Sequence, residues 1–128
     1  MKNIVFIPYI KRDHAITVSS SIGHAGRHAG YEYGIDSWKK WCDKNDCELY
    51  VMTELLLPES EMLITWQRWY VLEILEHNNI KYDQVLVVDA DSIVHPDCPN
   101  FFELTNHKFT SVLTDGDYEW VNRAINGY

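Results

Sequence analysis

Basic residues are scarce in this sequence: 11 Lys and Arg stand against 19 Asp and Glu, for a formal net charge of -8. With no basic stripe or tail, a nucleic acid or an anionic membrane surface is not the expected partner. Long apolar runs are also lacking. The run from Ile4 to Ile10 is short, contains Pro8 and precedes no small-residue cleavage site, so it predicts neither a membrane span nor a signal peptide.

Cysteine is rare as well, and the three present have no paired metal-ligand spacing. Cys42, Cys47 and Cys98 form an odd set, which favours reduced, buried thiols and a cytoplasmic protein. The glycines between 23 and 30 have the spacing of neither a dinucleotide fingerprint nor a Walker A loop. His24 and His28 would share a face of a helix, but these glycines favour a loop there instead.

What the sequence does contain is ample material for a core, with 46% hydrophobic and 13% aromatic residues. Its 128 residues suit one domain, 1–128. The predicted elements are a strand at 3–9, a helix at 31–45, a strand at 47–53, a helix at 61–77, a strand at 84–88, a helical turn at 101–104, a strand at 109–113 and an element within 118–125. This alternation predicts an α/β fold, an open and mainly parallel sheet with helices on both faces.

Both long helices have an apolar stripe that predicts the side facing the sheet. In the helix at 31–45 the stripe consists of Tyr31, Ile35, Trp38, Trp41 and Cys42. In the helix at 61–77 it consists of Leu63, Trp66, Tyr70, Val71 and Ile74. The tryptophans of both helices have two interpretations, as core residues or as part of a surface for a partner protein. They are Trp38 and Trp41 on the first helix and Trp66 and Trp69 on the second.

The stretch from Gln84 to Val94 carries the strongest chemical signal. Its first half lacks charge and predicts a strand buried on both faces, and it ends in Asp89-Ala90-Asp91. Alternate residues of an extended chain point the same way, so both carboxylates are expected to converge beyond the strand's carboxyl end. Open α/β sheets bind ligands at that edge, and a hard divalent cation suits two carboxylates. The alternative is a solvated turn with no ligand, because Asp is common in turns.

Three groups of residues between Trp66 and Leu104 resemble the GT-A fold glycosyltransferases, which use a nucleotide-diphosphate sugar as donor. Residues 85–91 resemble the DxD motif of that fold. Trp66-Gln67-Arg68 is similar to a Trp-x-basic element that several of these families carry before the motif. The third group is Tyr82-Asp83 before the strand and Pro99-x-Phe101-Phe102 after it.

The resemblance implies a metal-dependent transferase that moves a hexose from a UDP- or GDP-type sugar to an unknown acceptor. Asp89 and Asp91 would bind Mn2+ or Mg2+, with Asp91 as the more direct ligand. Arg68 would contact Asp89 or the donor phosphates, and Tyr9 would stack on the base. The cation would stabilise the charge that develops on the leaving diphosphate.

GT-A enzymes are generally twice this length, so the resemblance covers only the donor-binding half. It supplies no acceptor pocket and no catalytic base. Two explanations are open: a truncated or split transferase, whose fold a second copy or a second chain could complete, or a reduced domain that binds the nucleotide sugar without completing transfer. Asp115, Asp117, His95 and His107 follow the motif without a clear role.

Two other functions fit parts of the pattern. One is a non-catalytic interaction or structural module derived from a transferase. The other is an HAD-type phosphatase, where Asp89 would be the nucleophile, although Ser92-Ile93 replaces the small residues that usually follow such a pair.

Overall fold

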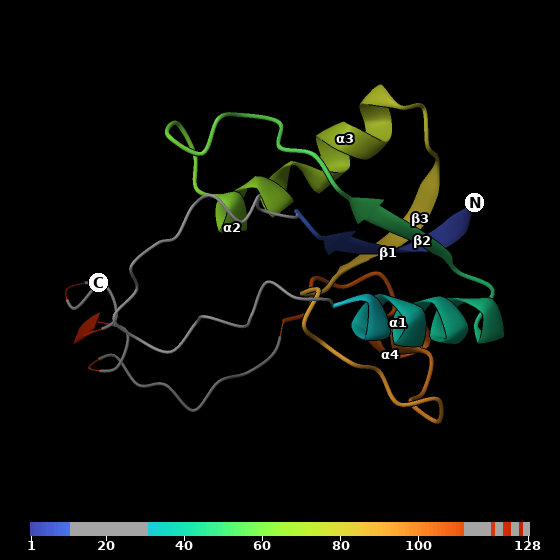
Figure 1. The fold of residues 1–128 in the computed structure, drawn as a ribbon. Helices are drawn as coiled ribbons and strands as arrows, with labels where there is room; N and C mark the ends of the chain where they lie inside the picture. Colours follow the sequence, from blue (N-terminus) through green and yellow to red (C-terminus); the bar gives the residue numbers. More distant parts are fainter. Residues whose placement is uncertain (11–30, 112–118, 120–121, 124–125, 127–128) are drawn as a thin grey trace.

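A three-stranded parallel sheet forms the centre of the protein. The computed structural model describes residues 1–10, 31–111, 119, 122–123 and 126. Within them the strands lie in the order β2-β1-β3 (Figure 1). The elements are β1 (Lys2–Pro8), α1 (Glu32–Lys44), β2 (Glu48–Met52), α2 (Ile64–Gln67), the 3-10 helix η1 (Arg68–Tyr70), α3 (Val71–His77), β3 (Tyr82–Val87) and α4 (Phe101–Thr105). The predicted open, parallel α/β fold is confirmed.

The central strand β1 separates two hydrophobic clusters, because its successive side chains point to opposite faces of the sheet. Val5 and Ile7 pack in the cluster that includes Trp38 and Trp41 of α1. Ile4 and Phe6 pack in the other cluster, which includes residues of α3. Figure 1 shows α1 and α4 on one side of the sheet and α3 on the other. Helices therefore cover both faces, as predicted.

The stripe predicted for the first helix is confirmed: Trp38, Trp41 and Cys42 are buried, and Ile35 packs beside them. The predicted helical turn after the acidic motif is α4. Its Phe102 is buried, and the ring of Phe101 stacks on Trp41 with centroids 5.2 Å apart. This aromatic packing ties the segment that follows β3 to α1.

The prediction of β3 as a strand buried on both faces is wrong for the described part of the chain. β3 pairs only with β1 there, so its side chains from Gln84 to Val87 are half-buried. The strand with a run of buried residues is β1, from Ile4 to Ile7. The strand predicted at 109–113 is also wrong for residues 109–111, which have no strand structure, and Phe109 is 93% exposed. Residues 112–113 lie outside the described chain, as do His24, His28, Asp115 and Asp117.

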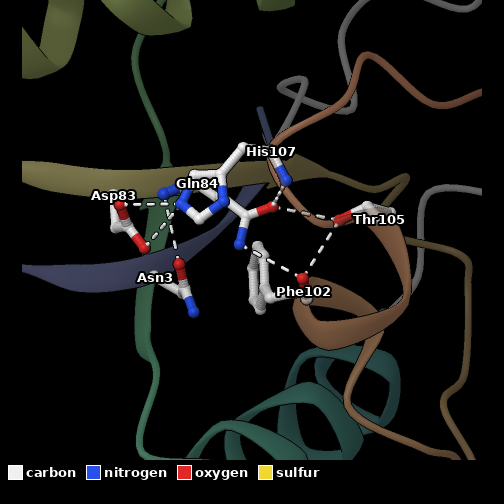
Figure 2. A network of polar contacts seen from close by, with 6 residues as sticks. All are labelled: Asn3, Asp83, Gln84, Phe102, Thr105 and His107. Atoms are coloured by element: carbon white, nitrogen blue, oxygen red, sulfur yellow. Dashed lines mark hydrogen bonds and ion pairs between the residues drawn. The ribbon is translucent and has the colours of Figure 1, made fainter.

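A polar network at the start of β3 fixes α4 and the chain after it (Figure 2). The Gln84 side chain donates to the Phe102 carbonyl (3.2 Å) and accepts from the Thr105 hydroxyl (3.1 Å) and the His107 backbone N–H (2.9 Å). The His107 ring lies 3.0 Å from the Asp83 carboxylate. These contacts hold His107 at the amino end of β3, at the opposite end of the strand from the acidic motif.

The single helix predicted at 61–77 is instead divided into α2, η1 and α3. Its buried positions are Gln67, Val71 and Leu75, which are four residues apart. Leu63, Trp66 and Trp69 are 59%, 59% and 64% exposed, so the predicted stripe is wrong at its first two positions. The error arose because the stripe was drawn through apolar residues only. The position buried before Val71 is occupied by a polar residue, Gln67.

The three cysteines are free thiols, and Cys42 and Cys47 are buried, as predicted. Burial, with a smaller effect of Cys47, raises the pKa of Cys42 from 9.0 to about 12. Below pH 9 the thiol is protonated in both folded and unfolded chains. Between pH 9 and 12 only the unfolded chain loses this proton, so the free energy of unfolding falls.

We therefore expect the free energy of unfolding to fall more steeply above pH 9 in the wild type than in Cys42→Ala, measured by urea denaturation. Cys98→Ala, which removes a half-buried thiol, is measured beside it as the control for the substitution. Parallel curves for the wild type and Cys42→Ala would contradict this assignment.

Candidate functional site

The acidic motif lies in a turn at the carboxyl end of β3. The Val88 N–H still donates to the Phe6 carbonyl at 3.0 Å, and the Ser92 N–H then donates to the Asp89 carbonyl at 3.0 Å. That second bond closes a β-turn over residues 89–92. Pro8 helps to end the pairing of β1 with β3. Alternate residues of a strand direct their backbone groups to the same neighbouring strand, so the Pro8 nitrogen faces β3, as the Phe6 carbonyl does. Proline has no N–H to donate there. On the other side, Tyr9 N–H still bonds Met52 (2.8 Å), so pairing with β2 continues there.

The turn changes the geometric argument for the two carboxylates. The expectation that they converge assumed an extended chain, whereas β3 ends at Val87 and Asp91 lies inside the turn. Both aspartates are exposed. Their position at the carboxyl end of a parallel strand agrees with the edge where open α/β sheets bind ligands.

Arg68 reaches Asp89 across 21 residues of sequence. Its Nη1 donates to Asp89 Oδ1 in an ion pair, and its Nε donates to the Thr65 carbonyl at 2.9 Å. The side chain of Arg68 is 25% exposed and that of Asp89 is 58% exposed. The predicted contact of Arg68 with Asp89 is thus present. A partly solvated pair of this kind contributes only about 0–1 kcal/mol, so it orients the carboxylate more than it stabilises the fold.

The two carboxylates therefore differ. Asp89 has one oxygen engaged by Arg68, whereas the Asp91 side chain makes no hydrogen bond or ion pair within the part of the chain that the structure describes. The described residues also contain no cluster of three or more His, Cys, Asp or Glu side chains that could hold a metal ion. If Asp89 and Asp91 both reached a cation, the protein would supply two hard carboxylates. Such a set fits Mg2+ or Mn2+ only when phosphate oxygens and water complete the coordination.

Tyr9 connects the end of β1 to the start of α1. Its hydroxyl donates to Glu32 Oε1 (3.1 Å) and accepts from the Tyr31 N–H (3.3 Å). Its ring meets that of Tyr31 edge to face, with centroids 6.1 Å apart. Stacking of Tyr9 on a nucleotide base stays a prediction.

Two open grooves lie beside α1 in the described part of the chain. One, of about 550 Å3, lies between α1 and β2 around Cys42 and Tyr50. The other, of about 390 Å3, lies between α1 and residues 93–96. Neither groove is lined by Asp89 or Asp91. His95 is exposed beside Asp97, 3.9 Å away.

Sequence reasoning missed the residues that support the turn from α1. The Trp38 indole N–H donates to the Ser92 hydroxyl at 3.0 Å, and the Val94 N–H donates to the Ser37 hydroxyl at 3.1 Å. A Cβ added to Gly34 would lie 2.6 Å from the Ala90 carbonyl oxygen. Gly34 was the available signal, because a glycine inside a helix often marks a close packing contact.

The fold and this turn define a small α/β domain with an open parallel sheet and a pair of aspartates at the carboxyl end of one strand. Comparisons of the chain with protein families, with curated proteins and with solved structures give no match. No helix among the described residues is both long and apolar enough to cross a membrane.

Proposed function

We propose that this chain binds a nucleotide-diphosphate sugar through a divalent cation, as the donor-binding part of a GT-A type glycosyltransferase. The observation that carries the proposal is the acidic turn after β3, where Arg68 orients Asp89 and Asp91 has no partner among the described residues. The position at a parallel strand's carboxyl end and the resemblance of residues 66–104 to these enzymes support the same function.

The chemistry assigns a separate task to each side chain. Asp91 would coordinate Mn2+ or Mg2+ directly, and Asp89 would contribute its free oxygen, Oδ2. Arg68 would hold Asp89 in place through its planar guanidinium, and would present positive charge near the phosphates. The cation, when bound, would stabilise charge on the leaving diphosphate. The catalytic base and the acceptor site are not assigned to any residue.

Calorimetric titration tests this function. With only two protein carboxylates, Mn2+ alone should bind weakly, and UDP or GDP alone should bind weakly to a chain of net charge -8. Together they should bind at least about tenfold more tightly, because phosphate oxygens complete the coordination. The measurement compares UDP, GDP and their hexose conjugates with Mn2+ present and with EDTA. Equal heats with and without Mn2+ would contradict the proposal.

An interaction module is the second candidate, and one observation favours it. Four apolar side chains are between 46% and 64% exposed: Leu63, which precedes α2, and Trp66, Trp69 and Leu72 on α2, η1 and α3. Exposed apolar side chains gathered on one segment are typical of protein-binding surfaces. Absence of heat with every nucleotide, combined with unchanged behaviour of an Asp91→Asn variant, would favour this function.

The HAD-type phosphatase has less support. Its nucleophile would be Asp89, but Arg68 already engages a carboxylate oxygen of that residue. Tight binding of beryllofluoride in the absence of nucleotide would nevertheless favour the phosphatase.

A further inference from the structure

We infer that one face of α1, formed by Gly34, Ser37 and Trp38, positions the acidic turn so that its carboxylates are presented to the cation; this inference rests on the proposed function. These three residues are spaced three and four apart, so they lie on the same side of the helix. All three meet the segment from Ala90 to Val94. Their contacts are with backbone atoms and with the Ser92 side chain, so none of the three engages a carboxylate of the turn.

Ser92 is the link between the helix and the turn. Its hydroxyl accepts the Trp38 indole N–H at 3.0 Å and donates to the Asp89 carbonyl at 2.5 Å. The Ser92 backbone N–H donates to that same carbonyl at 3.0 Å. The indole, the hydroxyl and the carbonyl thus form a chain of hydrogen bonds that joins α1 to the first residue of the turn.

Gly34 sets how closely the helix approaches. A Cβ at this position would lie 2.6 Å from the Ala90 carbonyl oxygen and 2.7 Å from that of Ser92. Those distances are too short for any side chain, so glycine alone permits the observed packing. Ser37 then accepts the Val94 N–H at 3.1 Å and donates to the Gly34 carbonyl at 2.7 Å, which fixes the chain where it leaves the turn.

The matched pair Trp38→Phe and Trp41→Phe tests this role. Both remove an indole N–H from a buried tryptophan of α1, but the Trp41 N–H bonds the Cys98 carbonyl (3.3 Å), outside the turn. We expect the amide hydrogen exchange of Ser92, measured by NMR, to be about tenfold faster in Trp38→Phe than in Trp41→Phe. A factor of about ten corresponds to the loss of roughly one hydrogen bond. Affinity for Mn2+ with UDP or GDP should fall about tenfold as well, the typical effect of a lost supporting contact.

A second pair separates positioning from stability. Ser92→Thr keeps the hydroxyl and should retain wild-type Mn2+ affinity, whereas Ser92→Ala should lose about as much as Trp38→Phe, roughly tenfold. All affinities are measured where circular dichroism shows the variants to be folded. Mn2+ electron paramagnetic resonance gives the fraction of Mn2+ that is bound. If α1 only stabilised the fold, this fraction would be the same in every folded variant.

The outcomes are distinguishable. If Trp38→Phe and Trp41→Phe exchange and bind alike, the positioning role is wrong even though the wild type binds Mn2+ and nucleotide. If the wild type binds neither, the proposed function fails and the ligand-presenting part of this inference fails with it. Exchange at Ser92 then still decides whether α1 holds the turn.

Discussion

Asp91→Asn is expected to weaken the joint binding of Mn2+ and nucleotide by about 100-fold or more. Loss of a residue that only supports a metal ligand typically costs about 10- to 100-fold in metal affinity, and Asp91 is the proposed ligand itself. An amide oxygen replaces a charged ligand, and the side chain forms no protein contact in the described structure that could compensate. For the same reason, the free energy of unfolding should change by no more than about 0.5 kcal/mol. The prediction therefore combines a large loss of binding with unchanged stability, measured by calorimetry and urea denaturation.

Asp97→Asn is the matched control for Asp91→Asn. It makes the same change in net charge on an exposed aspartate of the same loop, whose carboxylate lies 4.0 Å from the Lys44 ammonium and 3.9 Å from the His95 ring. Long-range electrostatics should affect both variants alike, so Asp97→Asn should bind as the wild type does. Equal losses in the two variants would show that net charge, and not coordination, governs binding.

Gln67→Met is expected to lower the free energy of unfolding by about 3 kcal/mol, since buried polar groups left without partners cost about 1–3 kcal/mol each. Gln67 is fully buried, and its amide uses its full bonding capacity. Its oxygen accepts the N–H groups of Leu56 (2.9 Å) and Leu57 (3.1 Å), and its nitrogen donates to the carbonyls of Leu57 and Met62 (both 2.9 Å). Methionine fills a similar volume but makes none of these bonds. Urea denaturation measures the loss.

Gln84→Met provides the comparison for Gln67→Met. Gln84 also binds backbone groups of a distant segment, but it is half-buried, so water can replace its bonds. We expect a loss of about 1 kcal/mol there, the typical net value of a hydrogen bond. If Gln67→Met costs no more than Gln84→Met, the four bonds of Gln67 do not hold the connection between β2 and α2.

Much of the fold could be predicted from the sequence because local patterns reported it directly. The uncharged run of β1 predicted a central strand, and the apolar stripe of α1 predicted which side faces the sheet. The 61–77 segment failed for a physical reason. Periodicity counts apolar side chains, but at Gln67 burial is stabilised by hydrogen bonds with another segment, and Trp66 turns outward instead.

The candidate site divides in the same way. The sequence by itself determined that two carboxylates follow a strand of the parallel sheet, because residue type and strand order are local properties. The resemblance implied that Arg68 contacts Asp89 or the donor phosphates, and only the tertiary structure showed that the contact with Asp89 forms. Only the tertiary structure showed that Gly34 and Trp38 support the turn. Those contacts join residues 21 to 58 positions apart in the sequence. The packing of α1 and η1 against the sheet selects these contacts, and no local sequence pattern encodes that packing.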